Sequence, residues 1–339
     1  AQNHGIDIRM LTGDHTAIGN QVAGQVGLKK NVKPANELFG DMESKKDEDI
    51  LKDVTDEEVF EASGFAEVTP EHKFYLIKEF QSGDRIVGMT GDGVNDAPAL
   101  QQADVGIAVH SATDAARSAA DLVLTKPGLG VIINAIEEAR RIFERMTSYA
   151  TFRITETVRV LLFITGAILA YNFYPVTPIM IVLLAILNDI PIMFIAYDNV
   201  RTAKHPVRWD MRRVLTIASI LGIAGVISSF ILLWYTRSYL GLTPEIIQTM
   251  IFLKLLVAGH MTIFLTRNTG WLWQKPWPHW LLVLGLEGTQ IIGTLFAVYG
   301  ILITPIGWTK ALLVWAYAIV WLLFLNGINV LTHKALGTR

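Results

Sequence analysis

The fold is decided by the stretch Met89-Thr90-Gly91-Asp92-Gly93-Val94-Asn95-Asp96-Ala97-Pro98-Ala99-Leu100. The apolar run just before it predicts a short buried strand, and Pro98 suits the first turn of a helix. Two glycines let the backbone turn sharply and approach a ligand. Asp92 and Asp96 lie four residues apart, and carboxylates on such a loop suit Mg²⁺, which favours one or two carboxylates together with substrate phosphate. The alternative is a plain acidic turn between strand and helix.

The composition divides the 339 residues into two parts. Residues 1–145 contain 15 Lys and Arg against 25 Asp and Glu, a net charge of −10, whereas residues 146–339 contain 14 against 6, a net charge of +8. The second part is strongly apolar, and its few charges lie mostly between apolar runs, which is typical of a membrane domain. We therefore expect an acidic soluble domain followed by a membrane domain. The sequence has no cysteine, which excludes disulfides and thiolate sites.

Strand and helix patterns alternate along residues 1–145, which predicts a parallel sheet with helices on both faces. Strands are expected at 6–11, 65–68, 85–89, 104–109 and 122–124, and helices at 16–26, from Pro70, from Pro98, at 112–120 and from Gly128. The charged residues 29–61, with Lys45-Lys46-Asp47-Glu48-Asp49 near their middle, are expected to form a solvated surface excursion.

Polar residues follow two of these strands. Thr12-Gly13-Asp14 comes after the first strand, at the sheet edge where open α/β folds place ligands. Thr12 can hydrogen-bond a phosphate oxygen there, or it can be a plain turn residue. Lys73 lies in the first turn of the helix from Pro70, where the helix dipole favours anions. It can hold a phosphate as a point charge, or it can be an ordinary exposed lysine.

Six apolar runs after the soluble part are long enough to span a membrane as helices. They cover 150–173, 177–198, 213–235, 246–266, 280–302 and 310–331. The helix from Gly128 has no stop signal before the first run and is expected to continue into it. Basic residues gather before the first run, in the even loops and at the C-terminus. We therefore expect the soluble domain, the even loops and the C-terminus to face the cytoplasm.

Charged residues within membrane spans are costly, so each is a candidate for function. Asp189 lies mid-span beside Asn188, and Pro191 weakens the helix there and frees backbone carbonyls. Arg159 lies mid-span in the preceding run, at a depth at which it can pair with Asp189. The pair is expected to carry a proton, because burial raises a carboxyl pKa and a nearby guanidinium lowers it. The alternative is a static pair that fixes helix packing.

The charges near these spans also bear on the ion. A Ca²⁺ site needs several converging oxygens, whereas these two spans offer only Asp189 and Glu156, with Arg159 close by. This disfavours a divalent cation and suits a proton. A second polar cluster is formed by Lys254, His260 and Glu287 in later spans, or these are packing pairs and snorkelling groups.

Four segments resemble, in order, the signature motifs of P-type ATPases, the ion pumps that pass through an aspartyl phosphate. They are 10–14 (Met-Leu-Thr-Gly-Asp), 68–73 (Val-Thr-Pro-Glu-His-Lys), 89–100 and 103–108 (Ala-Asp-Val-Gly-Ile-Ala). The residues at 70–73 and at Leu187-Asn188-Asp189 are most similar to the corresponding motifs of the plasma-membrane proton-exporting subfamily. The resemblance covers essentially the whole chain. It implies a partial haloacid-dehalogenase-like domain, a Rossmann-like α/β fold, in residues 1–145, and an all-α bundle of the last six transmembrane helices in residues 146–339.

The resemblance also implies that the polar residues of the motifs form a phosphorylation site. The catalytic residues would be Thr12, Gly13, Asp14, Lys73 and Asn95, and the metal ligands Asp92 and Asp96. In the family, the threonine binds the aspartyl phosphate, the lysine neutralises phosphoryl charge, and the asparagine donates to a phosphate oxygen. The first aspartate holds Mg²⁺ and the second supports it. ATP and Mg²⁺ are the implied substrate and cofactor. This agrees with the chemistry, because phosphoryl transfer needs positioned positive charge and a metal ion more than covalent machinery.

For transport, the resemblance implies that Asp189 accepts and releases the proton, with Asn188 beside it and Arg159 near it. That subfamily usually continues Leu-Asn-Asp with Gly-Thr, whereas Ile190-Pro191 follows here. Another monovalent cation, Na⁺ or K⁺, therefore stays open as an alternative.

The family's nucleophile is the first aspartate of an Asp-Lys-Thr-Gly-Thr motif, which does not occur in this sequence. The nucleotide-binding domain, the actuator domain and the first four spans do not occur either. We therefore expect the C-terminal part of a multi-pass plasma-membrane pump, inactive by itself. Its expected partners are the missing N-terminal portion and membrane lipid, and not nucleic acid. The alternatives are a membrane-tethered phosphatase of the same fold and a non-catalytic membrane subunit.

Overall fold

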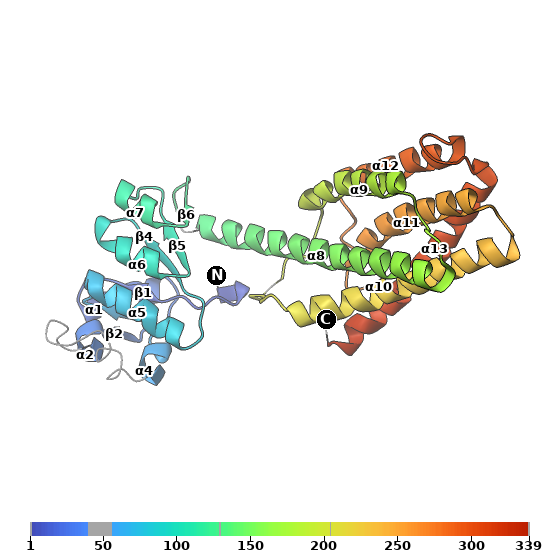
Figure 1. Cartoon of the computed structure of the whole chain (residues 1–339). Helices are drawn as coiled ribbons and strands as arrows, with labels where there is room; N and C mark the ends of the chain where they lie inside the picture. The colour runs from blue at the N-terminus through green and yellow to red at the C-terminus, as the bar shows by residue number, and fades with distance from the viewer. Residues whose placement is uncertain (1, 40–55, 129, 204, 338–339) are drawn as a thin grey trace. The chain divides into compact units, whose positions relative to one another are not determined.

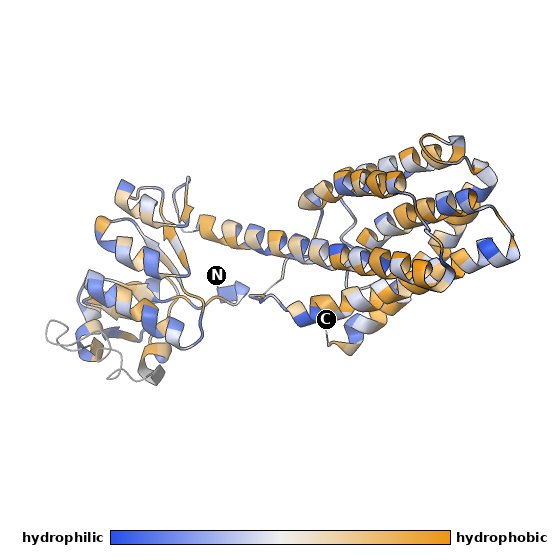
Figure 2. Cartoon of the chain, viewed as in Figure 1, coloured by the Kyte–Doolittle hydropathy of each residue, from blue (hydrophilic) through white to orange (hydrophobic). Residues whose placement is uncertain are grey.

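The computed structural model describes residues 2–39, 56–128, 130–203 and 205–337. The chain divides into two compact units, one formed by Ala1–Glu138 with Lys204–Pro206, the other by Ala139–Ala203 with Val207–Arg339. We refer to them as unit 1 and unit 2 (Figure 1). Hydrophilic residues are frequent in unit 1, whereas hydrophobic residues dominate most helices of unit 2 (Figure 2).

Unit 1 contains two parallel sheets of three short strands each. The first has the order β1 (Met10–Leu11), β3 (Gly64–Ala66), β2 (Val32–Pro34), and the second the order β4 (Gly88–Gly91), β5 (Val105–Ala108), β6 (Leu122–Val123). In the first sheet Met10 lies opposite Gly64, and in the second Gly88 lies opposite Val105. The parallel pairing confirms the sequence prediction, although the paired strands are shorter than the apolar runs.

Helices connect these strands. They are α1 (Thr16–Gln25), α2 (Ala35–Phe39), α4 (Asp56–Glu61), α5 (Pro70–Ser82), α6 (Ala97–Gln102) and α7 (Asp114–Ala119), with short 3₁₀ turns at η1 (Gln2–His4) and η3 (Val94–Asp96). Two boundaries follow directly from local chemistry. Thr69 caps α5 by accepting the amide of His72, and Pro70 opens the helix. Past the end of α1, Gly27 has a φ of +81°, a conformation that glycine adopts without strain.

The segment 29–61 differs from the sequence prediction of a surface excursion. Its first part forms β2 and α2, and β2 pairs in parallel with β3. In this strand only Val32 is fully buried, so the apolar pattern is too short to be recognised in the sequence. The charged run 45–49 lies outside the described residues.

The core of unit 1 consists of two hydrophobic clusters. One includes Phe39, Phe65 and Leu76, and the other includes Met89 and Leu100. Leu11 packs against both clusters from the end of β1. The core therefore supports the strand ends from which the polar loops leave.

Unit 2 is a bundle of six long helices. They are α8 (Gly130–Tyr171), α9 (Pro178–Ile192), α10 (Met211–Trp234), α11 (Pro244–Thr266), α12 (Trp280–Tyr299) and α13 (Gly307–Ala335). All six are long and apolar enough to cross a membrane, which confirms the predicted number of spans in the described residues. Helix α8 continues without a break from Gly130 to Tyr171, also as predicted, and its first residues belong to unit 1.

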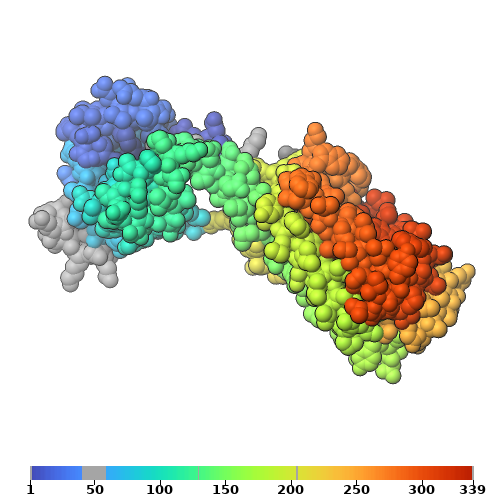
Figure 3. Space-filling view, turned by 90° about the horizontal axis from the view of Figure 1, so that it is seen from above, coloured from blue at the N-terminus to red at the C-terminus, as the bar shows by residue number. Residues whose placement is uncertain are grey.

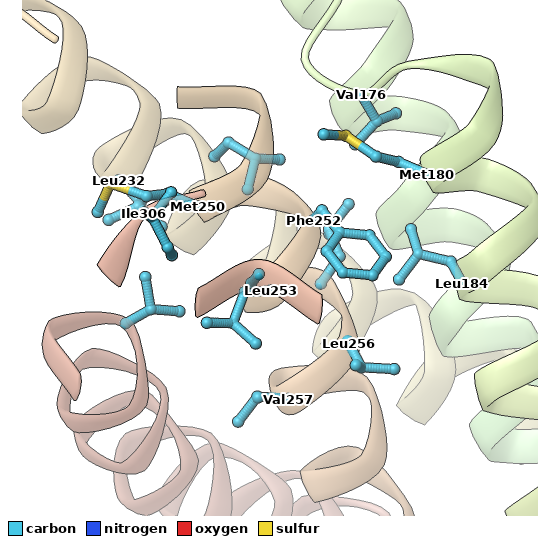
Figure 4. Packing of buried hydrophobic residues seen from close by; sticks show 14 of the residues in the cluster. Val176, Met180, Leu184, Leu232, Met250, Phe252, Leu253, Leu256, Val257 and Ile306 are labelled. Atoms are coloured by element: carbon cyan, nitrogen blue, oxygen red, sulfur yellow. The ribbon is translucent and has the colours of Figure 1, made fainter. Parts of the chain in front are cut away.

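Helix α11 lies at the centre of this bundle. Sixteen of its 23 residues are buried, and it packs against α9, α10, α12 and α13. Figure 4 shows the apolar side chains at this centre, with Leu253, Leu256 and Val257 of α11 between neighbouring helices. In the space-filling view of Figure 3, residues of α12 and α13 (orange to red) cover much of the visible face of unit 2.

Two of the helices change their winding near one end. Helix α9 contains Pro191 and becomes the 3₁₀ helix η4 (Met193–Tyr197). Because proline has no backbone N–H, the carbonyl of Leu187 has no donor four residues later. Helix α10 ends in the π-helical turn η5 (Tyr235–Tyr239).

Candidate functional site

The loop between β4 and α6 is held together by the carboxylate of Asp96. This side chain is only 8% exposed. Its Oδ1 accepts a hydrogen bond from Lys73 Nζ at 2.6 Å, and its Oδ2 accepts the backbone N–H groups of Asp92 and Gly93 at 3.1 and 3.2 Å. The first turn of α5 and the tip of the 91–96 loop are therefore joined at one carboxylate.

Close packing makes this arrangement specific. A Cβ on Gly91 would lie 2.6 Å from the Cβ of Asp96, so no larger residue fits at that position without movement. Burial raises the pKa of the Asp96 carboxyl, but the hydrogen bonds from Lys73 and from the amides of Gly93 and Asp92 lower it by more. The net pKa is lowered, and the carboxylate stays charged at neutral pH beside its lysine.

The same loop presents two other polar side chains outward. Asp92 and Asn95 are both exposed, whereas both oxygens of Asp96 already accept hydrogen bonds. Asp92 is therefore the predicted metal ligand with oxygen atoms free to bind. An exposed carboxylate next to a positive lysine fits a site shared by Mg²⁺ and phosphate. Among the described residues no three His, Cys, Asp or Glu side chains form a metal-binding group, so the protein would supply few ligands.

The Thr12-Gly13-Asp14 segment forms a compact turn at the end of β1. Thr12 Oγ1 donates to Asp14 Oδ2 at 3.0 Å, and the Asp14 amide donates back to Thr12 Oγ1 at 3.1 Å. The backbone of Thr12 also pairs with the β3–α5 connection, since its N–H donates to Phe65 and its carbonyl accepts from Val68. Because Val68 directly precedes the cap of α5, the turn is tied to the helix that carries Lys73.

These contacts place the predicted phosphate residues on three connected loops. Thr12 and Asp92 directly follow β1 and β4, and Lys73 lies in the first turn of α5, which follows β3. The carboxyl ends of the strands form the edge at which parallel sheets place their ligands. Chemically, the arrangement can hold an anionic oxygen near Lys73 and a divalent cation at Asp92.

In unit 2, the expected pair between Arg159 and Asp189 does not form, and this is a correction. Arg159 instead binds Glu156, three residues earlier on α8, and both side chains are buried. Arg159 also donates to Thr262 Oγ1 and to the carbonyl of Leu255, both on α11. The reason is geometric, because residues three apart lie on the same face of a helix and this face of α8 packs into the bundle.

Asp189 pairs with a different arginine of α8. Its Oδ1 accepts from Arg153 Nη1 at 3.3 Å, and the two side chains are 60% and 48% exposed. Beside it, the buried Oδ1 of Asn188 has no hydrogen-bond partner among the described residues. The carboxylate of α9 is thus accessible in this structure, whereas the guanidinium of Arg159 is not.

The polar residues of the later spans do not form one cluster. Lys254 of α11 donates to Ser229 Oγ at 2.6 Å and to the carbonyl of Gly225 at 3.3 Å, both on α10. The ring of His260 is fully buried beside the backbones of Leu187 on α9 and Leu286 on α12. Lys254 and His260 therefore face different helices.

Sequence reasoning missed a buried ion pair at the ends of the spans. Asp198 accepts from Arg267 at 2.8 Å and from the amide of His279, and both side chains of the pair are 3% exposed. The pair joins the segments that follow α9 and α11 to the start of α12. Both residues lie at the edges of apolar runs, where a charged residue is typical of a loop, so nothing in the sequence indicates their contact.

Family models support the first part of the fold. Two models described as haloacid dehalogenase-like hydrolase match residues 1–104 and 73–136. Unit 1 therefore has a haloacid dehalogenase-like fold with parallel sheets, and the helical part with six candidate spans follows it.

A relative covers nearly the whole chain. A protein of Methanocaldococcus jannaschii, named provisionally as cation-transporting ATPase MJ1226, is 52% identical over 332 residues, which are 98% of this chain and 41% of the relative. The chain thus spans less than half the length of this relative. A solved structure of the catalytic domain of the CPx-ATPase CopB-B, studied for its conformational changes upon nucleotide binding, is 22% identical over 40% of each chain, with a TM-score of only 0.29.

The motifs, the fold of unit 1 and this relative agree. The chain is a homologue of a protein named as a cation-transporting ATPase, with a haloacid dehalogenase-like domain and six helices able to cross a membrane.

Proposed function

We propose that the chain is the C-terminal part of an ATP-driven cation pump that works through an aspartyl phosphate. The observation that carries this proposal is the Asp96 carboxylate, which joins Lys73 to the Asp92–Gly93 loop. A phosphoryl group needs positive charge and a metal held in fixed positions. This loop arrangement provides the lysine and leaves the Asp92 carboxylate free for the metal.

The predicted site residues of unit 1 have distinct roles in this proposal. Lys73 neutralises phosphoryl charge, and Asp96 keeps the lysine and the loop in place. Asp92 holds Mg²⁺, which supplies further positive charge at the phosphate when bound. Thr12, in its turn with Asp14, hydrogen-bonds the phosphate, and Asn95 donates to a phosphate oxygen. The nucleophilic aspartate and the nucleotide site come from an N-terminal portion of the same protein, which is the principal partner.

We propose a proton as the transported ion. The buried carboxylate of Glu156 is already neutralised by Arg159, and Lys254 adds a second buried cation. The described spans therefore offer no set of converging carboxylates for a divalent cation. Asp189 accepts and releases the proton, and Arg153, in the place that was expected for Arg159, favours its release. Na⁺ or K⁺ transport is the alternative, supported by Ile190-Pro191 where the proton pumps usually have Gly-Thr.

In this proposal the pump lies in the plasma membrane with unit 1 in the cytoplasm. Basic residues before the first span and in the even loops support this orientation. The six helices of unit 2 contact lipid over their outer faces, which carry many exposed apolar side chains.

The test uses a longer protein that contains this chain and an upstream Asp-Lys-Thr-Gly-Thr segment, reconstituted in vesicles. ATP should acidify the vesicle interior, and Asp189→Asn should abolish this. As a matched control, Glu287→Gln removes a half-buried carboxylate on α12 and should leave acidification intact. Unchanged acidification in Asp189→Asn would refute the proton assignment, and ATP-driven uptake of Na⁺ or K⁺ without acidification would favour the alternative.

A further inference from the structure

A small cavity lies inside unit 2 between α8, α10, α11 and α13. Its wall includes the buried cations Arg159 and Lys254, together with Ser228, Thr262 and Trp321. The cavity has a volume of about 10 Å³, measured as the space that the centre of a water-sized sphere can occupy. That is about the space that one water molecule or one monatomic ion requires.

A protonated Lys254 has no counter-charge of its own beside this cavity. Arg159 and Lys254 are each 1% exposed, and Glu156, bound to Arg159, is the one buried carboxylate near them. No acidic side chain lines the cavity among the described residues. Asp189, on α9, is exposed and pairs with Arg153. An unpaired buried ammonium costs several kcal/mol, so Lys254 stays protonated only if it gains a counter-charge that the described residues do not supply.

The hydrogen-bond donors are also in excess. Arg159 Nε is buried and has no acceptor in the described chain. When Lys254 is protonated it has three N–H donors, of which Ser229 Oγ and the Gly225 carbonyl take two. Arg159 Nε, and the third N–H of Lys254 when it is protonated, are thus without an acceptor in the described chain, whereas the rest of the wall is mainly apolar.

We propose that this cavity binds one monatomic monovalent anion of the chloride class, held between Arg159 and Lys254. Such an anion supplies the missing negative charge and accepts from the unused donors. The small volume excludes oxyanions such as sulfate, and the apolar side chains around it tolerate a halide better than a strongly hydrated ion. The bound anion allows Lys254 to stay protonated in the interior of the bundle. This proposal does not depend on which cation is pumped.

The experiment is equilibrium binding of radiolabelled chloride to the detergent-solubilised chain, with gluconate as the other anion. We expect one saturable site per chain, displaced by bromide and not by sulfate. Lys254→Met removes the charge but keeps a long apolar stem, and it should abolish the site. Lys334→Met removes an exposed lysine near the end of α13 and should bind chloride as the unaltered chain does.

Thermal unfolding provides a second readout that needs no variant. The midpoint should rise with chloride concentration and level off at saturation, at constant ionic strength, because a ligand bound only to the folded state stabilises it. Equal midpoints in chloride and gluconate, or no saturable binding, would overturn the proposal. Unchanged binding in a folded Lys254→Met protein would overturn it as well.

Discussion

Asp96→Ala should open the 91–96 loop without unfolding unit 1. Two backbone N–H groups, those of Asp92 and Gly93, donate to the buried Asp96 carboxylate at 3.1 and 3.2 Å. A hydrogen bond to a charged acceptor contributes roughly 1.5–3 kcal/mol. Removing the acceptor should therefore accelerate hydrogen exchange of these two amides by about 10- to 100-fold, since about 1.4 kcal/mol corresponds to a factor of ten.

Hydrogen exchange followed by mass spectrometry of peptides covering residues 88–103 measures this effect. Asp92→Asn is the matched control, because it makes a similar loss of charge in the same loop at an exposed side chain. In the absence of Mg²⁺ the control should change local stability by less than about 0.5 kcal/mol. If exchange in Asp96→Ala matched the unaltered chain, or if both variants accelerated it equally, Asp96 would not be the anchor of the loop.

Two further predictions concern helix packing and pH. Gly259→Ala should lower the thermal midpoint, because the new Cβ would lie 2.5 Å from Glu156 Oε1 and overpacking costs about 1–3 kcal/mol, whereas Gly288→Ala, with no atom within 4 Å, should not. Equal midpoints for the two variants would contradict this packing. Burial lowers the pKa of His72, and its neutral ring accepts the Thr69 amide at 3.1 Å. Exchange protection at the start of α5 should therefore be full above about pH 6.5, the usual histidine value, and fall as the pH decreases through the lowered pKa. His72→Gln should remove this pH dependence, and the same dependence in that variant would assign it to another group.

The motif loops of unit 1 were predictable because their chemistry is local. Pro70 and Thr69 begin α5 by capping rules, and the Asp92 loop depends on its own glycines and carboxylates. Strand β2 was missed because it has one fully buried residue and is stabilised by pairing with β3, about thirty residues further along the chain. That pairing leaves no periodic pattern in the sequence.

The ion pairs of the arginines in unit 2 show a second limit of prediction from the sequence. Depth along two spans made Asp189 a reasonable partner for Arg159, but depth does not give the rotation of each helix. Glu156 lies three residues from Arg159 on the same helix, and that spacing was readable from the sequence. The pair of Asp198 with Arg267 depends on how three helix ends meet, which only the packed bundle determines.

The central claim is that the Asp92 loop is the metal-binding half of a phosphorylation site. Incubation with radiolabelled ATP and Mg²⁺ tests it most directly, in a longer protein that includes an upstream Asp-Lys-Thr-Gly-Thr segment. We predict an acid-stable, hydroxylamine-sensitive label on that protein, its loss in Asp92→Asn, and no label on this chain alone. A label that persists in Asp92→Asn, or that forms on this chain by itself, would contradict the account.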